Sequence, residues 1–171
     1  MPENRFITQI CVVVEDARAA SANWARVLGL PEARVETIFP SSASLVHYTH
    51  GQVAAYTDLQ VAKYQLEHLV LELMQPGQSP SPWRDFLDRN GPGVFHFCVL
   101  VGDRPAFQQT LSAIGVDLPY HVGYFPRGSY SYVDSRAQLG LELSVNTLAD
   151  YGALFQGLLD GSRNPLDELQ S

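Results

Sequence analysis

The stretch "GVFHFCVLVGD", residues 93–103, has the composition of a buried β-strand, yet a histidine, His96, lies in its middle. A related stretch, "TQICVVVED", occupies residues 8–16 and has Gln9 at the place of His96. In both stretches a cysteine follows two residues later, and an acidic residue ends the apolar run. The chain is therefore predicted to contain a duplicated unit, of which His96 is a part.

The same order of elements follows each strand. A helix is predicted between a cap at Asp16 and a stop at Gly29, and a second one between Asp103 and Gly115. The apolar face of the first helix is predicted to hold Ala17, Ala20, Trp24, Val27 and Leu28. About three strand-like segments follow each helix, which makes two βαβββ modules.

The predicted fold is α+β, with two βαβββ modules that form an open, cup-shaped mixed sheet and carry their helices outside. Residues 1–171 are read as one domain, because the chain is too short for two large independent ones. Its predicted parts are module one at about 5–76, a connector with a short helix at 77–92, module two at about 93–146, and a C-terminal helix and tail at 147–171.

Composition excludes several classes of partner. The net charge is −7 with only 11 Lys and Arg, and no basic run offers a surface for nucleic acid or an anionic membrane. No stretch approaches the length of a membrane span, and the first residues lack a signal-peptide pattern, so a cytoplasmic protein is predicted. The two cysteines are interpreted as small, buried apolar residues.

Polar residues recur at two places in the duplicated unit. Gln9 and His96 are equivalent, and so are Glu72 and Glu142, each within a Leu-Glu-Leu strand. Taken singly, each residue has an ordinary structural explanation. Taken together, an imidazole, an amide oxygen and two carboxylates form a donor set for a divalent metal, and a cation would offset the repulsion between the carboxylates. The pattern predicts a metal site.

The chain resembles the vicinal oxygen chelate superfamily over roughly residues 6–146. The resemblance is carried by "LVLELMQP", "SPSPWRDFLDRNGPGVFHFCVLVGD" and "YSYVDSRAQLGLELS", which are most similar to the methylmalonyl-CoA epimerase branch. It implies a metal held by Gln9, Glu72, His96 and Glu142. Epimerases have histidine at the first position, so Gln9 is a departure, and the whole set is similar to that of glyoxalase I.

The resemblance implies a metal-dependent isomerase, epimerase or lyase that moves a proton through a metal-stabilised enolate of a small carbonyl or acyl substrate. Glu142 is the first choice of base and Glu72 the second. One divalent ion is expected, with Zn, Ni, Co, Mn and Mg all open. An additional glutamate of the epimerases, on a middle strand of the first module, has no obvious equivalent in "QVAAYTDLQ".

Two further residues are candidates for substrate contact. His68 precedes Glu72 by four residues and would share its face if residues 64–73 formed one strand. Tyr132 is preferred to Tyr130, because only one of them can face inward. Packing or surface roles are the alternative for both candidates.

A small-molecule substrate and a homodimer are expected, because open sheets of this kind usually pair their edges. Two other functions compete with the isomerase. One is a metal-free protein that sequesters a drug-like molecule in the same cup. The other is an Fe(II)-dependent extradiol dioxygenase, which the loss of a histidine at position 9 disfavours.

Overall fold

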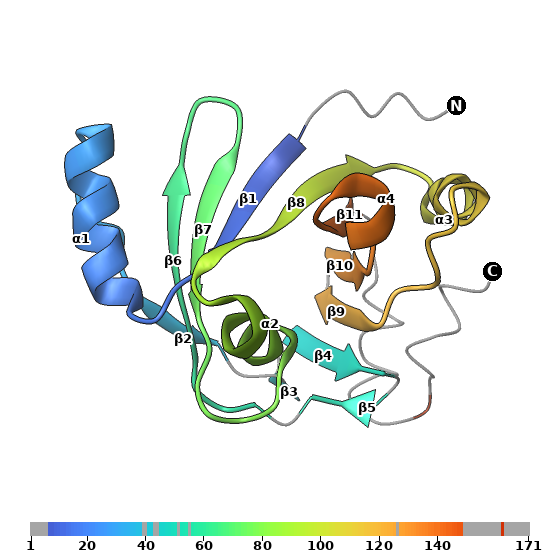
Figure 1. Cartoon of the computed structure of the whole chain (residues 1–171), viewed down its shortest axis with the longest axis horizontal. Coiled ribbons are helices and arrows are strands. Elements are labelled where there is room, and N and C mark those ends of the chain that lie inside the picture. Colours follow the sequence, from blue (N-terminus) through green and yellow to red (C-terminus); the bar gives the residue numbers. More distant parts are fainter. Residues whose placement is uncertain are drawn as a thin grey trace. The chain divides into compact units, whose positions relative to one another are not determined.

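The computed structural model describes residues 7–38, 41–42, 45–50, 52–54, 56–125, 127–148 and 162 (Figure 1). The chain divides into two compact units. We call Thr8–Phe39 with Ala55–Phe97 the N-terminal unit, and Met1–Ile7, Pro40–Ala54 and Cys98–Ser171 the C-terminal unit.

The N-terminal unit is a mixed sheet with two helices. Its strands are hydrogen-bonded in the order β2-β6-β7-β1, followed by β8, and the β1–β7 pair is parallel whereas β2–β6 and β6–β7 are antiparallel. The elements are β1 (Ile7–Val13), α1 (Ala17–Leu28), β2 (Glu36–Ile38), β6 (Leu59–Gln65), β7 (Val70–Gln75), α2 (Pro82–Asn90) and β8 (Gly93–Val101), which continues into the C-terminal unit.

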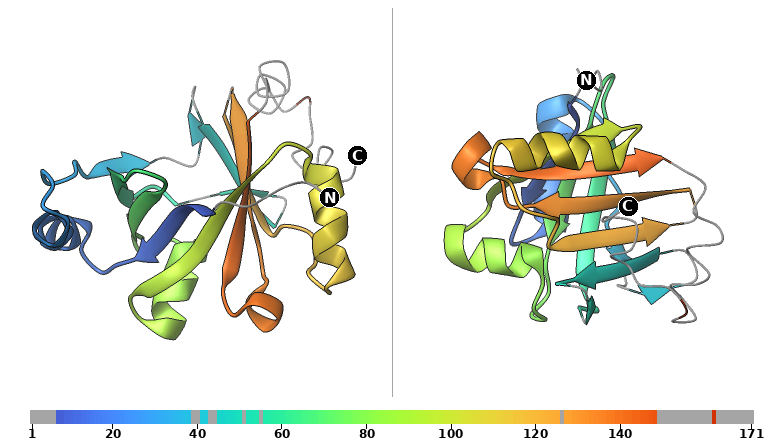
Figure 2. Two further views of the ribbon diagram at one scale, coloured as in Figure 1. Left: turned by 90° about the horizontal axis from the view of Figure 1, so that it is seen from above. Right: turned by 90° about the vertical axis from the view of Figure 1, so that its right-hand side faces the viewer.

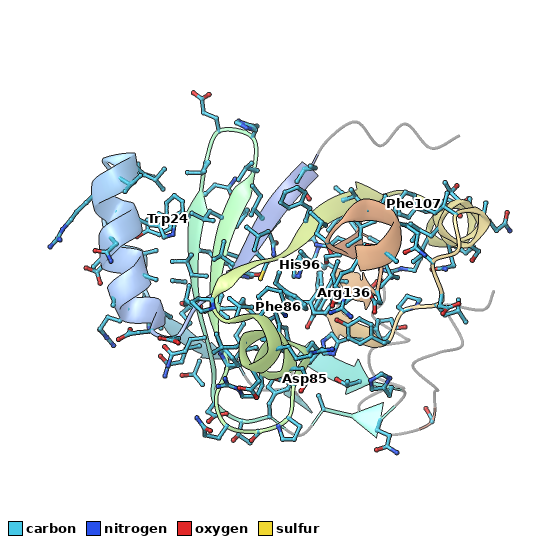
Figure 3. All side chains as sticks on the ribbon, viewed as in Figure 1. Trp24, Asp85, Phe86, His96, Phe107 and Arg136 are labelled. Atoms are coloured by element: carbon cyan, nitrogen blue, oxygen red, sulfur yellow. The ribbon has the colours of Figure 1, made fainter. Side chains whose placement is uncertain are left out.

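Helix α1 begins and ends where the sequence predicts. The Asp16 side chain accepts a hydrogen bond from the Ala19 backbone N–H, and Gly29 ends the helix at φ 66°. One face packs on Tyr64, Leu71 and Leu73 of the sheet, and Figure 3 shows Trp24 pointing toward these strands. The placement of Val27 on this face was wrong: it is 75% exposed, because it lies at the margin of the apolar stripe.

The segment expected to be one strand around His68 is a hairpin. Strand β6 ends at Gln65, β7 begins at Val70, and the Leu66 N–H donates to the Leu69 carbonyl to close the turn. His68 lies exposed in this turn and not on the strand face of Glu72, so that placement was wrong. The physical reason is the tight turn, which the polar pair Glu67-His68 can occupy in contact with water.

The C-terminal unit contains the remaining strands of the same hydrogen-bonded order. Its strands follow the order β11-β10-β9-β4-β3, with β5 on β4, and β8 precedes β11 in the hydrogen-bonded order. The elements are β3 (Ser41–Ser42), β4 (Leu45–Thr49), β5 (Gln52–Val53), α3 (Arg104–Ala113), β9 (His121–Phe125), β10 (Gly128–Val133), α4 (Arg136–Leu139) and β11 (Glu142–Leu148).

Strands β3, β4 and β5 come from the polar stretch that makes the first copy longer than the second. Although this stretch lies in the first half of the sequence, β4 is antiparallel to β9. On one face of this sheet, Val133, Leu143 and Val145 pack with Val101 and Leu111, and Figure 2 shows α3 along this side of the strands.

The predicted α+β class with glyoxalase-type strand–helix modules is confirmed. The predicted module boundaries stay a prediction, and the C-terminal helix expected within 147–171 falls almost wholly outside the described residues. None of the helices that the structure describes has the length and apolar character needed to cross a membrane.

Tyr64 provides a test of the N-terminal unit. Its hydroxyl donates to the Ser21 carbonyl oxygen at 2.6 Å and accepts from the Ala33 N–H at 3.1 Å, which ties α1 and the following loop to β6. Tyr64→Phe leaves these buried groups unsatisfied, so we expect the free energy of unfolding to fall by about 1–3 kcal/mol. Urea denaturation measures the change, and an unaltered midpoint would show that water replaces the lost hydrogen bonds.

Candidate functional site

Three donor side chains of the N-terminal unit lie together on adjoining strands. In the parallel β1–β7 ladder Cys11 is directly opposite Glu72, and His96 lies on β8 (Figure 3). The Cys11 sulfur, a Glu72 carboxylate oxygen and a His96 ring nitrogen all lie within 4.8 Å of one another. All three residues are buried. We call Cys11, Glu72 and His96 the donor cluster.

Gln9 and Lys63 contact the carboxylate of this cluster. Gln9 lies two residues before Cys11 on the same face of β1, and its Nε2 donates to Glu72 Oε2 at 2.6 Å. Lys63 is opposite Glu72 in the β6–β7 ladder, and its Nζ lies 3.0 Å from Glu72 Oε1. Each carboxylate oxygen therefore accepts from a nitrogen donor, and the lysine neutralises the buried charge.

Burial controls the protonation of His96. Loss of hydration lowers its pKa to about 3, so the imidazole is neutral at ordinary pH. The pKa of Lys63 is raised, first by the negative charge of Glu72, so its ammonium stays charged. A neutral imidazole beside an ionised carboxylate is the protonation state in which both residues can bind a cation.

The donor cluster fits a divalent metal on the chemistry of its side chains. It offers one sulfur, one nitrogen and carboxylate oxygens, all common metal ligands. Gln9 now directs its amide nitrogen toward Glu72, and a half-turn of that amide would present its oxygen instead. Glu72 would exchange the Lys63 ammonium for the metal as its counter-charge.

Glu142 lies in the C-terminal unit, at the start of β11. It is buried and accepts a hydrogen bond from the Tyr120 hydroxyl, while Arg136 Nε lies 3.7 Å from its other oxygen. Burial, followed by the charge of Glu142, raises the pKa of Tyr120, so the hydroxyl keeps its proton and serves as donor. The membership of Glu142 in the ligand set stays a prediction.

Tyr132 shares a sheet face with Glu142. It is buried and lies opposite Ser144 in the β10–β11 ladder, and Ser144 is two residues from Glu142 on β11. Its ring stacks on His121 at 4.9 Å between centroids, and the Thr49 hydroxyl is 2.8 Å from His121 Nδ1. The predicted contact of Tyr132 with substrate is not decided by this packing.

The structure adds three residues that the sequence interpretation did not single out for the site. Cys11 was interpreted as an apolar residue, although its position two residues from Gln9 on one strand was a signal that it faces the same side. Lys63 was not considered as a neighbour of Glu72, because its place opposite Glu72 depends on the hairpin turn. Tyr120 gave no local signal, since it meets Glu142 only through the pairing of distant strands.

The fold defines a class of protein: strand–helix modules on a mixed sheet, here with three side chains that could hold a metal ion on adjoining strands. The family model of the Glyoxalase/Bleomycin resistance protein/Dioxygenase superfamily matches residues 8–130, and the chain belongs to this superfamily. No curated protein matches the chain in sequence.

Solved structures with the same fold include epimerases. Methylmalonyl-CoA epimerase from Mycobacterium tuberculosis is 16% identical, with a TM-score of 0.57, and the match covers 90% of this chain and 95% of the epimerase. A Streptomyces coelicolor methylmalonyl-CoA epimerase variant in complex with 2-nitronate-propionyl-CoA is 17% identical, with a TM-score of 0.57 and coverage of 86% and 96%. A hypothetical protein from Bacillus halodurans is 16% identical, with a TM-score of 0.59 and coverage of 86% and 96%. These likenesses establish the fold.

Lys63→Met tests whether the lysine competes with a metal. Because Lys63 Nζ lies beside Glu72 and is partly exposed to solvent, its removal should raise the affinity for Zn(II) by roughly two- to fivefold. Isothermal titration calorimetry of the wild type and the variant measures the change. Lys63→Arg keeps the positive charge and serves as the control, and equal affinities in all three proteins would contradict the competition.

Proposed function

We propose that the protein is a metal-dependent isomerase, epimerase or lyase that transfers a proton next to the carbonyl group of a small carbonyl or acyl substrate. The observation that carries the proposal is the donor cluster, Cys11, Glu72 and His96, with Gln9 beside it. Superfamily membership and the epimerases among the neighbouring folds support it.

In this proposal Gln9, Glu72, His96 and Glu142 hold the metal, as the sequence resemblance implies. When bound, a divalent metal would polarise the substrate carbonyl and favour loss of the adjacent proton. The neutral imidazole of His96 and the ionised Glu72 are suited to this role as they stand.

Glu142 is the proposed base. Its carboxylate takes the proton from the carbon next to the carbonyl, the C–H electron pair moves toward the carbonyl oxygen, and the proton is returned to that carbon or its neighbour. The Tyr120 hydroxyl, which donates to Glu142, and Arg136 would hold the carboxylate in place. Glu72 is the second choice of base. Tyr132 and His68 are the predicted substrate contacts, although the exposed turn position of His68 gives its role no support.

Solvent isotope exchange tests the proposal. The chain, loaded in turn with Zn(II), Co(II), Ni(II), Mn(II) and Mg(II), is incubated in deuterated water with a methylmalonyl thioester or with the hemithioacetal of glutathione. Incorporation of deuterium next to the carbonyl, followed by NMR, supports proton transfer. Absence of exchange with both probes and every metal would overturn it for these two substrate classes, which are the ones the resemblance favours.

A metal-free binding protein is the second candidate, and one observation favours it. The Lys63 ammonium already neutralises Glu72, so the buried carboxylate does not require a metal for charge balance. Metal analysis of protein purified without chelator separates the two: about one divalent ion per chain supports the enzyme. Absence of metal, even after reconstitution, supports the binding protein. Homodimerisation stays a prediction, which analytical ultracentrifugation would test.

A further inference from the structure

We propose that Cys11 is itself a metal ligand, and that the N-terminal unit holds a thiophilic divalent ion, Zn(II) or Co(II), through Cys11, Glu72 and His96. The inference deepens the proposed function, on whose site it rests, by naming the class of metal. The proposed ligand set differs from the one that the resemblance implies. It adds the sulfur of Cys11, and all of its ligands come from the N-terminal unit.

The first support is the position of the donor atoms. Metal–ligand bonds of about 2.0–2.3 Å in a tetrahedral site place ligand atoms roughly 3.5 Å apart. The three donor atoms already lie within 4.8 Å of one another, so small side-chain rotations suffice to bring them to that spacing. Cys11 and Glu72 are fixed opposite each other by the β1–β7 ladder, which limits how far they can separate.

The second support is the chemistry of the donors. A thiolate is a soft ligand that binds zinc or cobalt and is a poor ligand for magnesium or calcium, whose preferred ligands are oxygens. Cys11 is fully buried, and the cluster is the group of His, Cys, Asp and Glu residues that meets metal-ligand spacing among the described residues. If Cys11 takes part, the metal is therefore a transition-series ion.

The third support is charge balance. A thiolate and a carboxylate together carry two negative charges, which a divalent ion neutralises while His96 stays neutral. In the structure the Lys63 ammonium faces Glu72. Lys63 also lines a cavity of about 270 Å³ with Glu36 and Arg34, so its long side chain has space and a second carboxylate to move toward.

Cobalt spectroscopy tests the inference directly. The full chain is titrated with Co(II), and a thiolate ligand gives an intense near-ultraviolet sulfur-to-cobalt charge-transfer band that oxygen and nitrogen ligands do not give. Cys11 and Cys98 are the two cysteines of the sequence, so Cys98→Ala is the matched control. We expect the band in the wild type and in Cys98→Ala, and its loss in Cys11→Ser.

The outcomes separate this inference from the proposed function. Cobalt binding without the charge-transfer band in wild type and Cys98→Ala overturns the role of Cys11 and leaves a metal enzyme with oxygen and nitrogen ligands. The band without isotope exchange keeps the sulfur ligand and overturns the proposed proton transfer for the two substrate classes tested. Far-ultraviolet circular dichroism checks whether Cys11→Ser folds. If it does not fold, the wild type still tests the inference, because absence of the charge-transfer band in cobalt-bound wild type is enough to overturn it.

Discussion

Glu72→Gln is expected to lower the affinity of the chain for Zn(II) by more than about 100-fold, since changes to mere supporting residues of metal sites already cost 10- to 100-fold. Glu72 supplies the carboxylate of the donor cluster, and glutamine has nearly the same shape without the charge. The hydrogen bond from Gln9 can persist, so the fold should be retained. Competition with a chromophoric chelator measures the affinity.

Glu67→Gln is the matched control for this change. Glu67 lies exposed in the turn between β6 and β7, so the same removal of charge should leave Zn(II) affinity within about twofold. Equal affinity of wild type and Glu72→Gln would contradict the donor cluster as the metal site. An equal loss in both variants would point to a general charge effect.

Glu142→Gln is expected to slow the exchange of substrate carbon-bound hydrogen with solvent by about 10²- to 10⁴-fold, the usual contribution of a general base. Glutamine can still accept the hydrogen bond from Tyr120 but cannot take up a proton from carbon. The measurement is the initial rate of deuterium incorporation into the substrate probe that the wild type accepts.

Asp134→Asn provides the comparison for this variant. Asp134 pairs with Arg136 as Glu142 does, but it is exposed, so its replacement should change the exchange rate little. Unchanged exchange in Glu142→Gln would overturn its role as base. If exchange were then lost in Glu72→Gln although metal remained bound, the base would be Glu72.

Local patterns in the sequence predict the helices well. Asp16 and Asp103 cap α1 and α3 through side-chain hydrogen bonds, and Ser81 does the same for α2. Such caps can be predicted from a short segment of sequence, because the backbone N–H that the capping side chain accepts from lies only three residues away. In a β-strand, side chains two residues apart point to the same face. This rule places Gln9 and Cys11 on one face of β1 without knowledge of the rest of the chain.

Strand register was the step at which sequence reasoning failed. Moving the register of a strand by one residue transfers all of its side chains to the opposite face of the sheet. The turn at Glu67-His68 interrupts the strand, and it was not recognised because apolar residues surround it. The consequence was that His68 was placed on the face of Glu72, and that Lys63, which lies opposite Glu72, was not considered as its neighbour. The contact of Tyr120 with Glu142 depends on the pairing of separate strands and had no local signal.

Strand β4 comes from the N-terminal half of the sequence and β9 from the C-terminal half, and the two strands are hydrogen-bonded to each other. A polypeptide cut within the connector at 77–92 would separate β9 from the strand that completes its hydrogen bonds. Neither fragment should then fold alone, whereas co-expressed fragments could reassemble. The two halves of the sequence therefore depend on each other for strand β9 to be fully hydrogen-bonded.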